Sequence, residues 1–443
     1  IKKNNSTFFL FLHKRNKNKL NYGGMMKKFI NTSLIALLAF FGSYSSSFAK
    51  DITLSMWTHN QLYVDYFNTY LEEVQAAFPD DNITFDFQVT PDMATNSLTA
   101  IASGSEHTDL LGIEISGFGL FMADDIISDN FVPLNDMYGD MSQWNPGKVA
   151  AWTHTDGNIY GIESEGCYMV YYYNPSILES YGRTVPSTWE EFMETGKILA
   201  KDGISMVLSE LRFIGMYQQA GGKFFNDDGE FAMDEDLFMD ILKYQEEAFK
   251  TGVINYTTDY WGQTPGVLYN SKQTVGTMAP DWYNNCCLQP TVKDTQSGEW
   301  RVAPLPTWGD KGYKTFHWGG TGFAIHKSSE GIDAAKKLLE LAYFSYEGQI
   351  AKYDFFGGMP TLLAALEDER IAGKKFDFYG GQKFAEPFIS VAGSSADDYQ
   401  HVGRAIIDTV SRDLTTLLAN GEITAEEAHE RFITQVQDEL DFL

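Results

Sequence analysis

The sequence predicts an α/β protein, and three patterns support that prediction. Near the start, the run ITLSMW (52–57) alternates apolar and small residues as a strand does. A helix-like segment (64–78) and a second strand-like run, NITFDFQV (82–89), follow it. Strand, helix and strand in this order are typical of a parallel sheet. Farther along, segments 331–349 and 423–440 repeat apolar residues at helical spacing.

The next two elements are a third strand and a hairpin. TDLLGIEI (108–115) is an apolar run that predicts a strand ending near Glu114. WTHTDGNIYGI (152–162) predicts a hairpin, because its Asp156-Gly157 pair supplies the positive φ that a tight turn requires. Turns and helices therefore alternate with strands through the first part of the chain.

Two helices are predicted to start at capping boxes, in which a Ser or Thr and a Glu three residues later satisfy each other's backbone N–H groups. In PSTWEEF, Ser187 precedes Glu190 at this spacing, which predicts a helix through Leu199. Thr424 and Glu427 repeat the spacing at the start of the last helical segment.

The first part of the chain has the pattern of an export signal. Residues 1–24 precede the first methionines, Met25 and Met26, and are interpreted as upstream sequence. Two lysines, the apolar run 34–41 and a Ser-Phe-Ala motif ending at Ala49 follow, as in a cleaved signal peptide. We expect cleavage after Ala49 and a protein free in the periplasm, because no cysteine stands at the cleavage point to carry a lipid. The alternative is an uncleaved anchor, but the run is far below the roughly 18 residues that span a bilayer.

The charge of the expected mature chain excludes two classes of partner. Its 394 residues carry 25 Lys and Arg against 60 Asp and Glu, a formal net charge of −35. This charge repels phosphate backbones and anionic lipid surfaces, so we expect neither nucleic acid nor bare membrane as a partner. A chain of this length is expected to form two domains.

The three cysteines, Cys167, Cys286 and Cys287, all lie in the expected mature chain. An adjacent pair closes into a disulfide only with strain, so we expect packing roles for all three, with a bridge as the alternative. Cofactor motifs are absent from the sequence: GGTGFAIHK (319–327) lacks the glycine spacing of a dinucleotide loop, and there is no Walker, H-E-x-x-H or G-x-S-x-G motif. We expect no cofactor and no metal.

A series of segments, taken in order along nearly all of the mature chain, resembles one known family. The segments are SGSEHTDL, IYGIESEGCYMVYYYNPSILESYGRTVPSTWEEF, YQQAGGKFFNDDGEF, GTMAPDWY, WGGTGFAIHKSSEGIDAAKKLLELAYFSYEGQ and GGMP. Each is weak by itself, but their shared order is specific. The chain resembles extracellular solute-binding protein family 1, the maltose-binding-like carbohydrate-binding proteins of ABC transporters.

The resemblance implies a two-lobed periplasmic-binding-protein fold of type II, with a ligand cleft between lobes joined by crossover hinges. Lobe 1 would comprise residues 50–162 and 316–363, and lobe 2 residues 168–307 and 369–443, with ESEG (163–166) on the first crossover. It also implies a monomer that encloses a carbohydrate and docks on permease subunits of an ABC importer in the inner membrane.

Sugar binding needs flat apolar faces and planar polar groups, and the candidates share a position at the end of a segment. They are Trp57, His59 and Asn60 after the first strand, Glu114 at the end of the third, Trp261, and Trp318 with Gly319 and Gly320. Ligands collect where the strands of open α/β sheets end, and glycine lets backbone approach a ligand closely. The resemblance adds Glu165, as the crossover glutamate, and Trp282 with Asp281, from a segment that carries a stacking aromatic in the family.

A binding protein without catalytic activity is the leading hypothesis, and two alternatives stay open. The first is a glycan hydrolase using Glu163 or Glu165 with a distant acid, Glu114 or Asp281. Such enzymes place two carboxyls roughly 5 to 9.5 Å apart around the scissile bond, whereas positions i and i+2 of an extended segment share one face. The second is a ferric-ion-binding relative that uses the tyrosines at 171–173, for which the scattered histidines supply no obvious partner.

Overall fold

The computed structural model describes residues 49–209, 213–226, 228–396 and 400–442. The chain divides into two units, Ile1–Lys50 and Asp51–Leu443. The expected start at Met25 or Met26 and the apolar part of the expected signal peptide lie outside the described residues. In the described ranges, no helix has both the length and the apolar character needed to cross a membrane.

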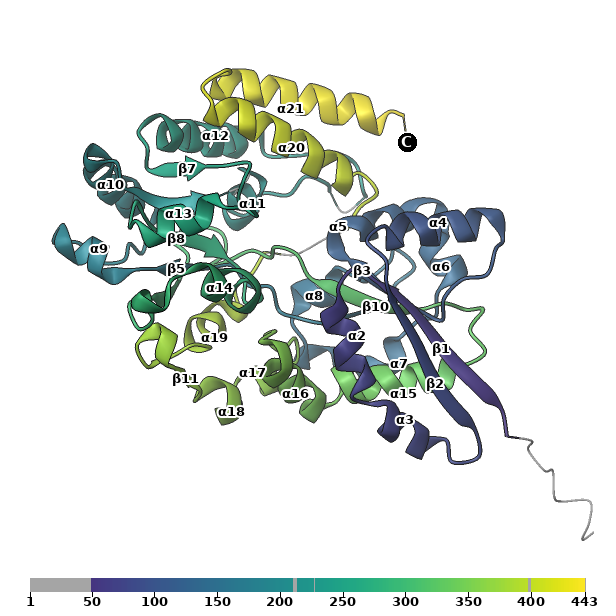
Figure 1. The fold of residues 1–443 in the computed structure, drawn as a ribbon. Helices are drawn as coiled ribbons and strands as arrows, with labels where there is room; N and C mark the ends of the chain where they lie inside the picture. The colour runs from purple at the N-terminus through teal and green to yellow at the C-terminus, as the bar shows by residue number, and fades with distance from the viewer. Residues whose placement is uncertain (1–48, 210–212, 227, 397–399, 443) are drawn as a thin grey trace, which may run out of the picture. The chain divides into compact units, whose positions relative to one another are not determined.

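Two five-stranded mixed sheets organise the described part of the second unit, Asp51–Leu443 (Figure 1). The first sheet has the order β2-β1-β3-β10-β4 and the second β7-β6-β8-β5-β9. The strands of the first are β1 (Asp51–Thr58), β2 (Asn82–Val89), β3 (Leu110–Glu114), β4 (Ile162–Glu163) and β10 (Thr321–Ile325). Those of the second are β5 (Val170–Tyr173), β6 (Ser205–Ser209), β7 (Ile254–Tyr256), β8 (Thr274–Ala279) and β9 (Arg301–Pro304). A small pair, β11 (Lys375–Phe376) and β12 (Gln382–Lys383), stands apart.

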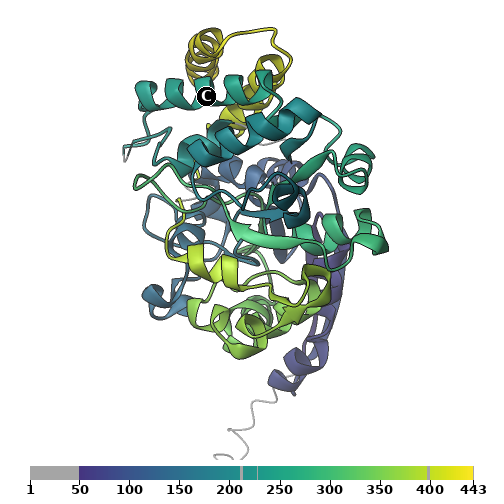
Figure 2. The ribbon, with the colours of Figure 1, turned by 90° about the vertical axis from the view of Figure 1, so that its left-hand side faces the viewer.

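Helices surround both sheets. Up to the first crossing they are α2 (Gln61–Asn68), α3 (Leu71–Ala77), α4 (Met93–Ser103), α5 (Ile115–Phe118), η1 (Gly119–Asp125), α6 (Ile126–Asn130), α7 (Asn135–Tyr138), η2 (Met141–Gln143) and α8 (Pro146–Ala150). Around the second sheet follow α9 (Pro175–Ser180), α10 (Trp189–Leu199), η3 (Ala200–Asp202), α11 (Phe213–Gln219), α12 (Glu235–Lys250), α13 (Thr264–Asn270), η4 (Asn284–Leu288), α14 (Gln289–Thr291) and η5 (Asp294–Gln296). The last are α15 (Ile332–Leu339), η6 (Glu340–Phe344), α16 (Tyr346–Phe356), α17 (Leu363–Leu366), α18 (Glu369–Ala372), η7 (Asp377–Tyr379), α19 (Glu386–Ala392), α20 (Arg404–Ala419) and α21 (Ala425–Leu440). Figure 2 shows α20 and α21 in yellow beside the teal helices of the second sheet, and α21 packs on α12.

The predicted strand, helix and strand at the start are confirmed as a parallel β-α-β unit. β1 and β2 pair in parallel from Asp51 with Asn82 to Thr58 with Val89, and β2 has the predicted bounds. The predicted helix 64–78 is two helices, α2 and α3, separated at Thr69 and Tyr70. The third strand ends at Glu114 as predicted.

The predicted helix starts show one correct assignment and one error of a single residue. Thr424 and Glu427 form the predicted capping box at the start of α21. At α10 the N-cap is Thr188, whose hydroxyl accepts from the Glu191 N–H at 3.2 Å, so the predicted Ser187–Glu190 box is wrong. PSTWEEF offers both Ser-x-x-Glu and Thr-x-x-Glu, and spacing alone does not choose between them.

The predicted hairpin and the predicted helix 331–349 are each partly realised. The hairpin is present as a single antiparallel bridge between Thr153 and Ile159, and Gly157 has φ +81°. The helical segment is divided into α15, the π-helical η6 and α16, because Ser345 leaves the helical conformation and caps α16 through the Gly348 N–H.

The chain passes between the sheets at three places. It leaves the first sheet after β4 and enters the second at β5, so the ESEG segment (163–166) begins the first crossing. It returns between β9 and β10, and Trp318 on that segment packs against the cores of both sheets. After α16 it crosses again to α19, which packs against β9. Ends of strands from both sheets are thereby brought close to the crossings.

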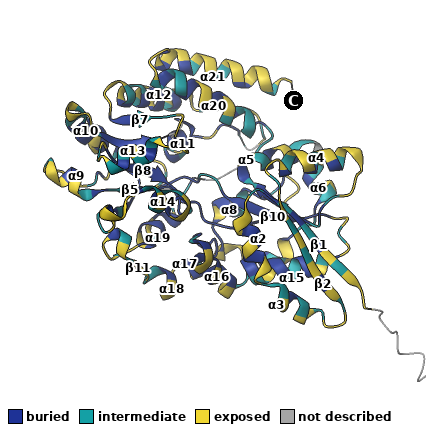
Figure 3. Cartoon of the chain, viewed as in Figure 1, coloured by how far each residue is buried: buried dark blue, intermediate teal, exposed yellow. Residues whose placement is uncertain are grey.

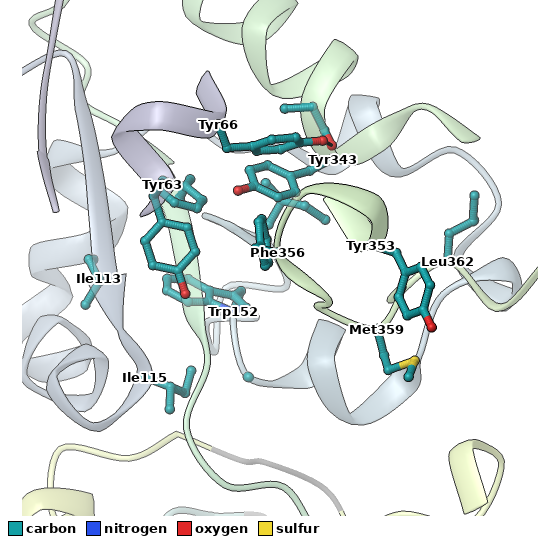
Figure 4. Packing of buried hydrophobic residues seen from close by; sticks show 14 of the residues in the cluster. Tyr63, Tyr66, Ile113, Ile115, Trp152, Tyr343, Tyr353, Phe356, Met359 and Leu362 are labelled. Atoms are coloured by element: carbon teal, nitrogen blue, oxygen red, sulfur yellow. Dashed lines mark hydrogen bonds between the residues drawn. The ribbon is translucent and has the colours of Figure 1, made fainter. Parts of the chain in front are cut away.

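Buried residues, dark blue in Figure 3, concentrate along the strands and on the helices around them. Figure 4 shows one part of this core, where Tyr63 and Tyr66 of α2 lie near Tyr343 and Phe356. The Tyr66 hydroxyl donates to the carbonyls of Ala342 at 3.1 Å and Gly348 at 2.9 Å. These contacts fix α2 against the start of α16, and Phe356 at the end of α16 lines a cavity.

Candidate functional site

A cavity of about 740 Å³ lies where strand ends of the two sheets meet the crossings. Its lining comes from segments far apart in the sequence: His59, Asn60, Leu62, Tyr63, Glu114, Glu165, Trp261, Trp282, Asn285, Cys286, Trp318, Gly319, Gly320, Thr321, Phe355 and Phe356. Most of the lining surface is apolar or aromatic, and a few polar groups converge on it. This combination is typical of a small-molecule site.

Trp261, Trp282 and Trp318 form a cluster, called here the three-tryptophan cluster. The Trp261 and Trp282 rings are stacked with centroids 6.1 Å apart, and Trp318 lies 5.9 Å from Trp261 and 5.8 Å from Trp282. The indole N–H of Trp282 donates to the Trp318 carbonyl at 3.3 Å, which orients the ring. Trp261 is 55% exposed, although large aromatic side chains are usually buried. The cluster therefore offers flat apolar faces to the cavity.

Gly319 and Gly320 let the chain pass close to this cluster. Gly319 has φ +74°, and a Cβ there would lie 3.3 Å from the Trp282 ring. Gly320 has φ +117°, and a Cβ there would lie 2.0 Å from Oε1 of Glu163. Both positions require glycine for conformation, and Gly320 requires it for space as well.

The two glutamates of the ESEG segment have different surroundings. Glu163 is buried, accepts a hydrogen bond from the Trp152 indole N–H at 2.7 Å and lies 3.7 Å from the Lys148 amine. Glu165 lines the cavity, and its Oε1 accepts from the Tyr63 hydroxyl at 2.8 Å. Its Oε2 is buried and has no hydrogen-bond partner in the described part of the chain. An orphaned buried acceptor of this kind is costly unless a ligand or water satisfies it.

Glu165 belongs to a buried charge cluster with Glu163, Asp281, Lys148 and Lys352. Burial, together with the nearby Glu163 and Asp281 carboxylates, raises the pKa of Glu165 to about 8. Burial also raises the pKa of Asp281 to about 6 and lowers the pKa of Lys352 to about 8. Glu165 therefore holds a proton at neutral pH, as a carboxylic acid that can donate as well as accept.

Polar groups of the first sheet complete the cavity. Asn60 caps α2 by accepting from the Leu62 N–H at 3.0 Å, and Glu114 caps α5 by accepting from the Ser116 N–H at 3.0 Å. Burial lowers the pKa of His59, so its imidazole is neutral near pH 7. These side chains stand at the carboxyl ends of β1 and β3, where open α/β sheets gather ligands.

The cavity brings together nine of the eleven residues singled out from the sequence, and two lie elsewhere. Trp57 is in β1, where Met56 and Thr58 are buried on the opposite face, and its ring packs on His107 with centroids 5.8 Å apart. Asp281 is buried behind the lining and accepts from the Met359 N–H at 2.5 Å. Strand alternation explains the position of Trp57, since neighbouring residues face opposite sides.

The lining residues that sequence reasoning did not identify are Leu62, Tyr63, Asn285, Cys286, Thr321, Phe355 and Phe356. Tyr63 is one of the buried aromatic residues of α2, Phe356 is buried at the end of α16, and Phe355 beside it is exposed. The cysteines were expected to pack, yet Cys286 and Cys287 form a disulfide, while Cys167 is free and buried. That correction adds a sulfur group to the cavity wall.

The tyrosines at 171–173 are part of the second sheet and its core. The Tyr171 hydroxyl donates to the Met206 carbonyl at 2.6 Å and the Tyr172 hydroxyl to the Pro280 carbonyl at 2.9 Å. Within the described residues, no three His, Cys, Asp or Glu side chains are grouped so as to hold a metal ion. The ferric-ion alternative therefore has no support from these tyrosines.

Comparisons with known proteins agree on one family. The model of the bacterial extracellular solute-binding proteins matches residues 63–345. An arabinooligosaccharide-binding protein of Halalkalibacterium halodurans is 25% identical over 396 residues, covering 85% of each chain. A protein of the same description from Bacillus subtilis is 22% identical over 335 residues, covering 71% of this chain and 75% of that one.

One solved structure, an extracellular solute-binding protein of family 1, superposes with a TM-score of 0.75 at 20% identity. The likeness covers 87% of this chain and 99% of that chain. It shows the predicted two-lobed solute-binding fold.

Proposed function

Since this chain belongs to the bacterial extracellular solute-binding proteins, we propose that it is the receptor of an ABC importer that captures an oligosaccharide. The observation that carries the proposal is that the three-tryptophan cluster and Glu165, whose buried Oε2 has no hydrogen-bond partner in the described residues, line one cavity. Indole faces stack on the C–H faces of sugar rings, and Glu165 exchanges hydrogen bonds with a hydroxyl. Two relatives described as arabinooligosaccharide-binding favour arabinooligosaccharides as the first ligands to test.

The proposed receptor binds its sugar without cleaving it. Glu163 is held by Trp152 and Lys148 and does not line the cavity, so it is not placed to attack a bound sugar. Glu165 and Glu114 both line the cavity, but Glu114 is engaged by the N–H and hydroxyl of Ser116 in capping α5. These engagements favour recognition over the paired acid and base of a hydrolase.

Capture would proceed by closure of two lobes. We assign residues 50–162 with 316–363 to lobe 1 and 168–307 with 369–443 to lobe 2, which follows the crossings between the sheets. A ligand that touches both lobes favours the closed form by its difference in affinity for the two forms. The closed monomer then presents its ligand to permease subunits of the inner membrane, after export to the periplasm and cleavage following Ala49.

Isothermal titration calorimetry with arabinooligosaccharides and malto-oligosaccharides of graded length tests the proposal. We expect one of the two series to bind with a stoichiometry of one, and chromatography to recover the sugar unchanged after long incubation. Ligand at 100 times Kd should add about 2.7 kcal/mol to the free energy of unfolding. A protein that binds neither series, or that shortens the chains, would refute the proposal.

A further inference from the structure

The Cys286–Cys287 disulfide lies on the wall of the cleft that the second sheet supplies. Both cysteines belong to the π-helical turn η4, and such turns are frequent at functional sites. Cys286 is exposed and lines the cavity, whereas Cys287 is half-buried and packs on the core. Cys286 of the disulfide thus faces the cavity, while Cys287 packs on the core behind it.

Cys286 stands beside Trp282 on this wall. The Cys286 N–H donates to the Trp282 carbonyl at 3.5 Å, so the two residues are one helical turn apart on the same face. Between them, the Asn285 side-chain amide donates to the Phe356 carbonyl at 2.9 Å and ties η4 to the end of α16. Phe356 lines the cavity as well. The disulfide therefore continues an apolar surface that begins at the three-tryptophan cluster.

Stabilisation of the fold does not account for this bridge. In the chain-entropy account, a disulfide stabilises a protein by closing a loop in the unfolded chain, and the gain grows with the length of the loop. Adjacent cysteines enclose no loop, so this gain is close to nothing. The bridge does change the surface, because it removes two S–H donors and leaves sulfur atoms and methylenes that are polarizable and apolar.

We propose that the Cys286–Cys287 disulfide contacts the bound oligosaccharide, packing on the apolar C–H face of the sugar residue next to the one stacked on Trp282. Polarizable sulfur in contact with carbon gains dispersion energy, while the absence of donors suits a face without hydroxyls. The inference rests on the proposed function and names a part of the cleft that recognises the sugar.

Reduction and substitution test the contact by calorimetry with the oligosaccharide that binds wild type best. We expect wild type reduced with a water-soluble phosphine, and Cys286→Ser/Cys287→Ser, to bind on the order of fivefold more weakly than the oxidised protein. The double variant also controls for other effects of the phosphine. It has no disulfide to reduce, so the phosphine should leave its Kd unchanged. Thermal unfolding checks that each form is folded, and the reduced wild type keeps the test valid if the variant is not.

The rate at which the Cys286–Cys287 disulfide is reduced distinguishes direct contact with the sugar from an indirect effect of the disulfide on the cavity wall. A sugar that covers the disulfide shields it, so saturating ligand should slow the appearance of two alkylatable thiols in wild type. An unchanged Kd after reduction, or reduction at the same rate with and without ligand, would overturn the inference. If oxidised wild type bound no oligosaccharide at all, the proposed function would fail instead.

Discussion

Glu165 lines the cleft; its Oε1 accepts a hydrogen bond from the Tyr63 hydroxyl, and its buried Oε2 has no hydrogen-bond partner in the described part of the chain. Its surroundings combine two carboxylates, Glu163 and Asp281, with the amine of Lys352. Burial and the two carboxylates outweigh the lysine, which is why the folded protein retains this proton at a pH where an exposed glutamate has lost it. The same residue is thus both a candidate sugar contact and a pH-sensitive point in the fold.

Glu165→Gln should change the pH dependence of stability. The folded pKa of about 8 lies above the ordinary value of 4.5, so the stability that this group contributes is present below pH 4.5 and is lost as pH rises through 8. Glutamine mimics the protonated form. Variant and wild type should therefore have similar free energies of unfolding near pH 4.5. Between pH 4.5 and pH 8, the free energy of unfolding of the variant should rise relative to that of wild type by up to about 1.4 kcal/mol per pH unit. Denaturant unfolding at a series of pH values measures the difference, and parallel profiles would contradict this assignment.

Gly320→Ala should destabilise the protein. The substitution combines a left-handed φ of +117° with a Cβ 2.0 Å from Glu163 Oε1, and strained backbone of this kind costs about 1 to 3 kcal/mol before the clash is counted. Gly393→Ala is the matched control, because a Cβ there has nothing within 4 Å. Thermal unfolding should show a clear loss for the first variant and little change for the second. Equal effects would mean that the close approach at Gly320 is not required.

At the scale of elements, the ends of β1 and β8 decide which tryptophans face the cavity. Trp282 follows β8 and lines the cavity, while Trp57 inside β1 packs on His107. Trp282→Ala should weaken oligosaccharide binding by about 1 to 3 kcal/mol, because it removes a stacking face. Trp57→Ala should leave Kd unchanged even if it lowers the melting temperature. Calorimetry of both variants checks this pair, and a larger affinity loss for Trp57→Ala would reverse the assignment.

Elements with a strong local pattern could be predicted from the sequence. Interruptions within a helical segment could not. β2 and the capping box of α21 depend on residues within one segment, and both were predicted. The interruption between α15 and α16 depends on Ser345 leaving a helix whose apolar spacing continues across it. The same limit applies to the cleft: Trp282 and Trp318 stand out at segment ends, whereas Phe356 joins the cavity only because α16 packs on α2.

On the scale of the whole molecule, three crossings join the sheets, and the buried charge cluster lies at them. Asp281, which follows β8, accepts a hydrogen bond from the Met359 N–H. Lys352 of α16 donates to the Ser164 and Met359 carbonyls. These bonds link segments on either side of the first and third crossings. These bonds hold the crossings together, and a ligand that touches both lobes would favour the closed form by its difference in affinity for the two forms.

Capture by lobe closure can be measured by small-angle X-ray scattering with and without the best-binding oligosaccharide. We expect a smaller radius of gyration at saturating sugar, because a ligand that touches Trp282 of lobe 2 and His59 or Asn60 of lobe 1 draws the two lobes together. An unchanged scattering curve at saturation, with binding verified by calorimetry on the same sample, would contradict capture by lobe closure.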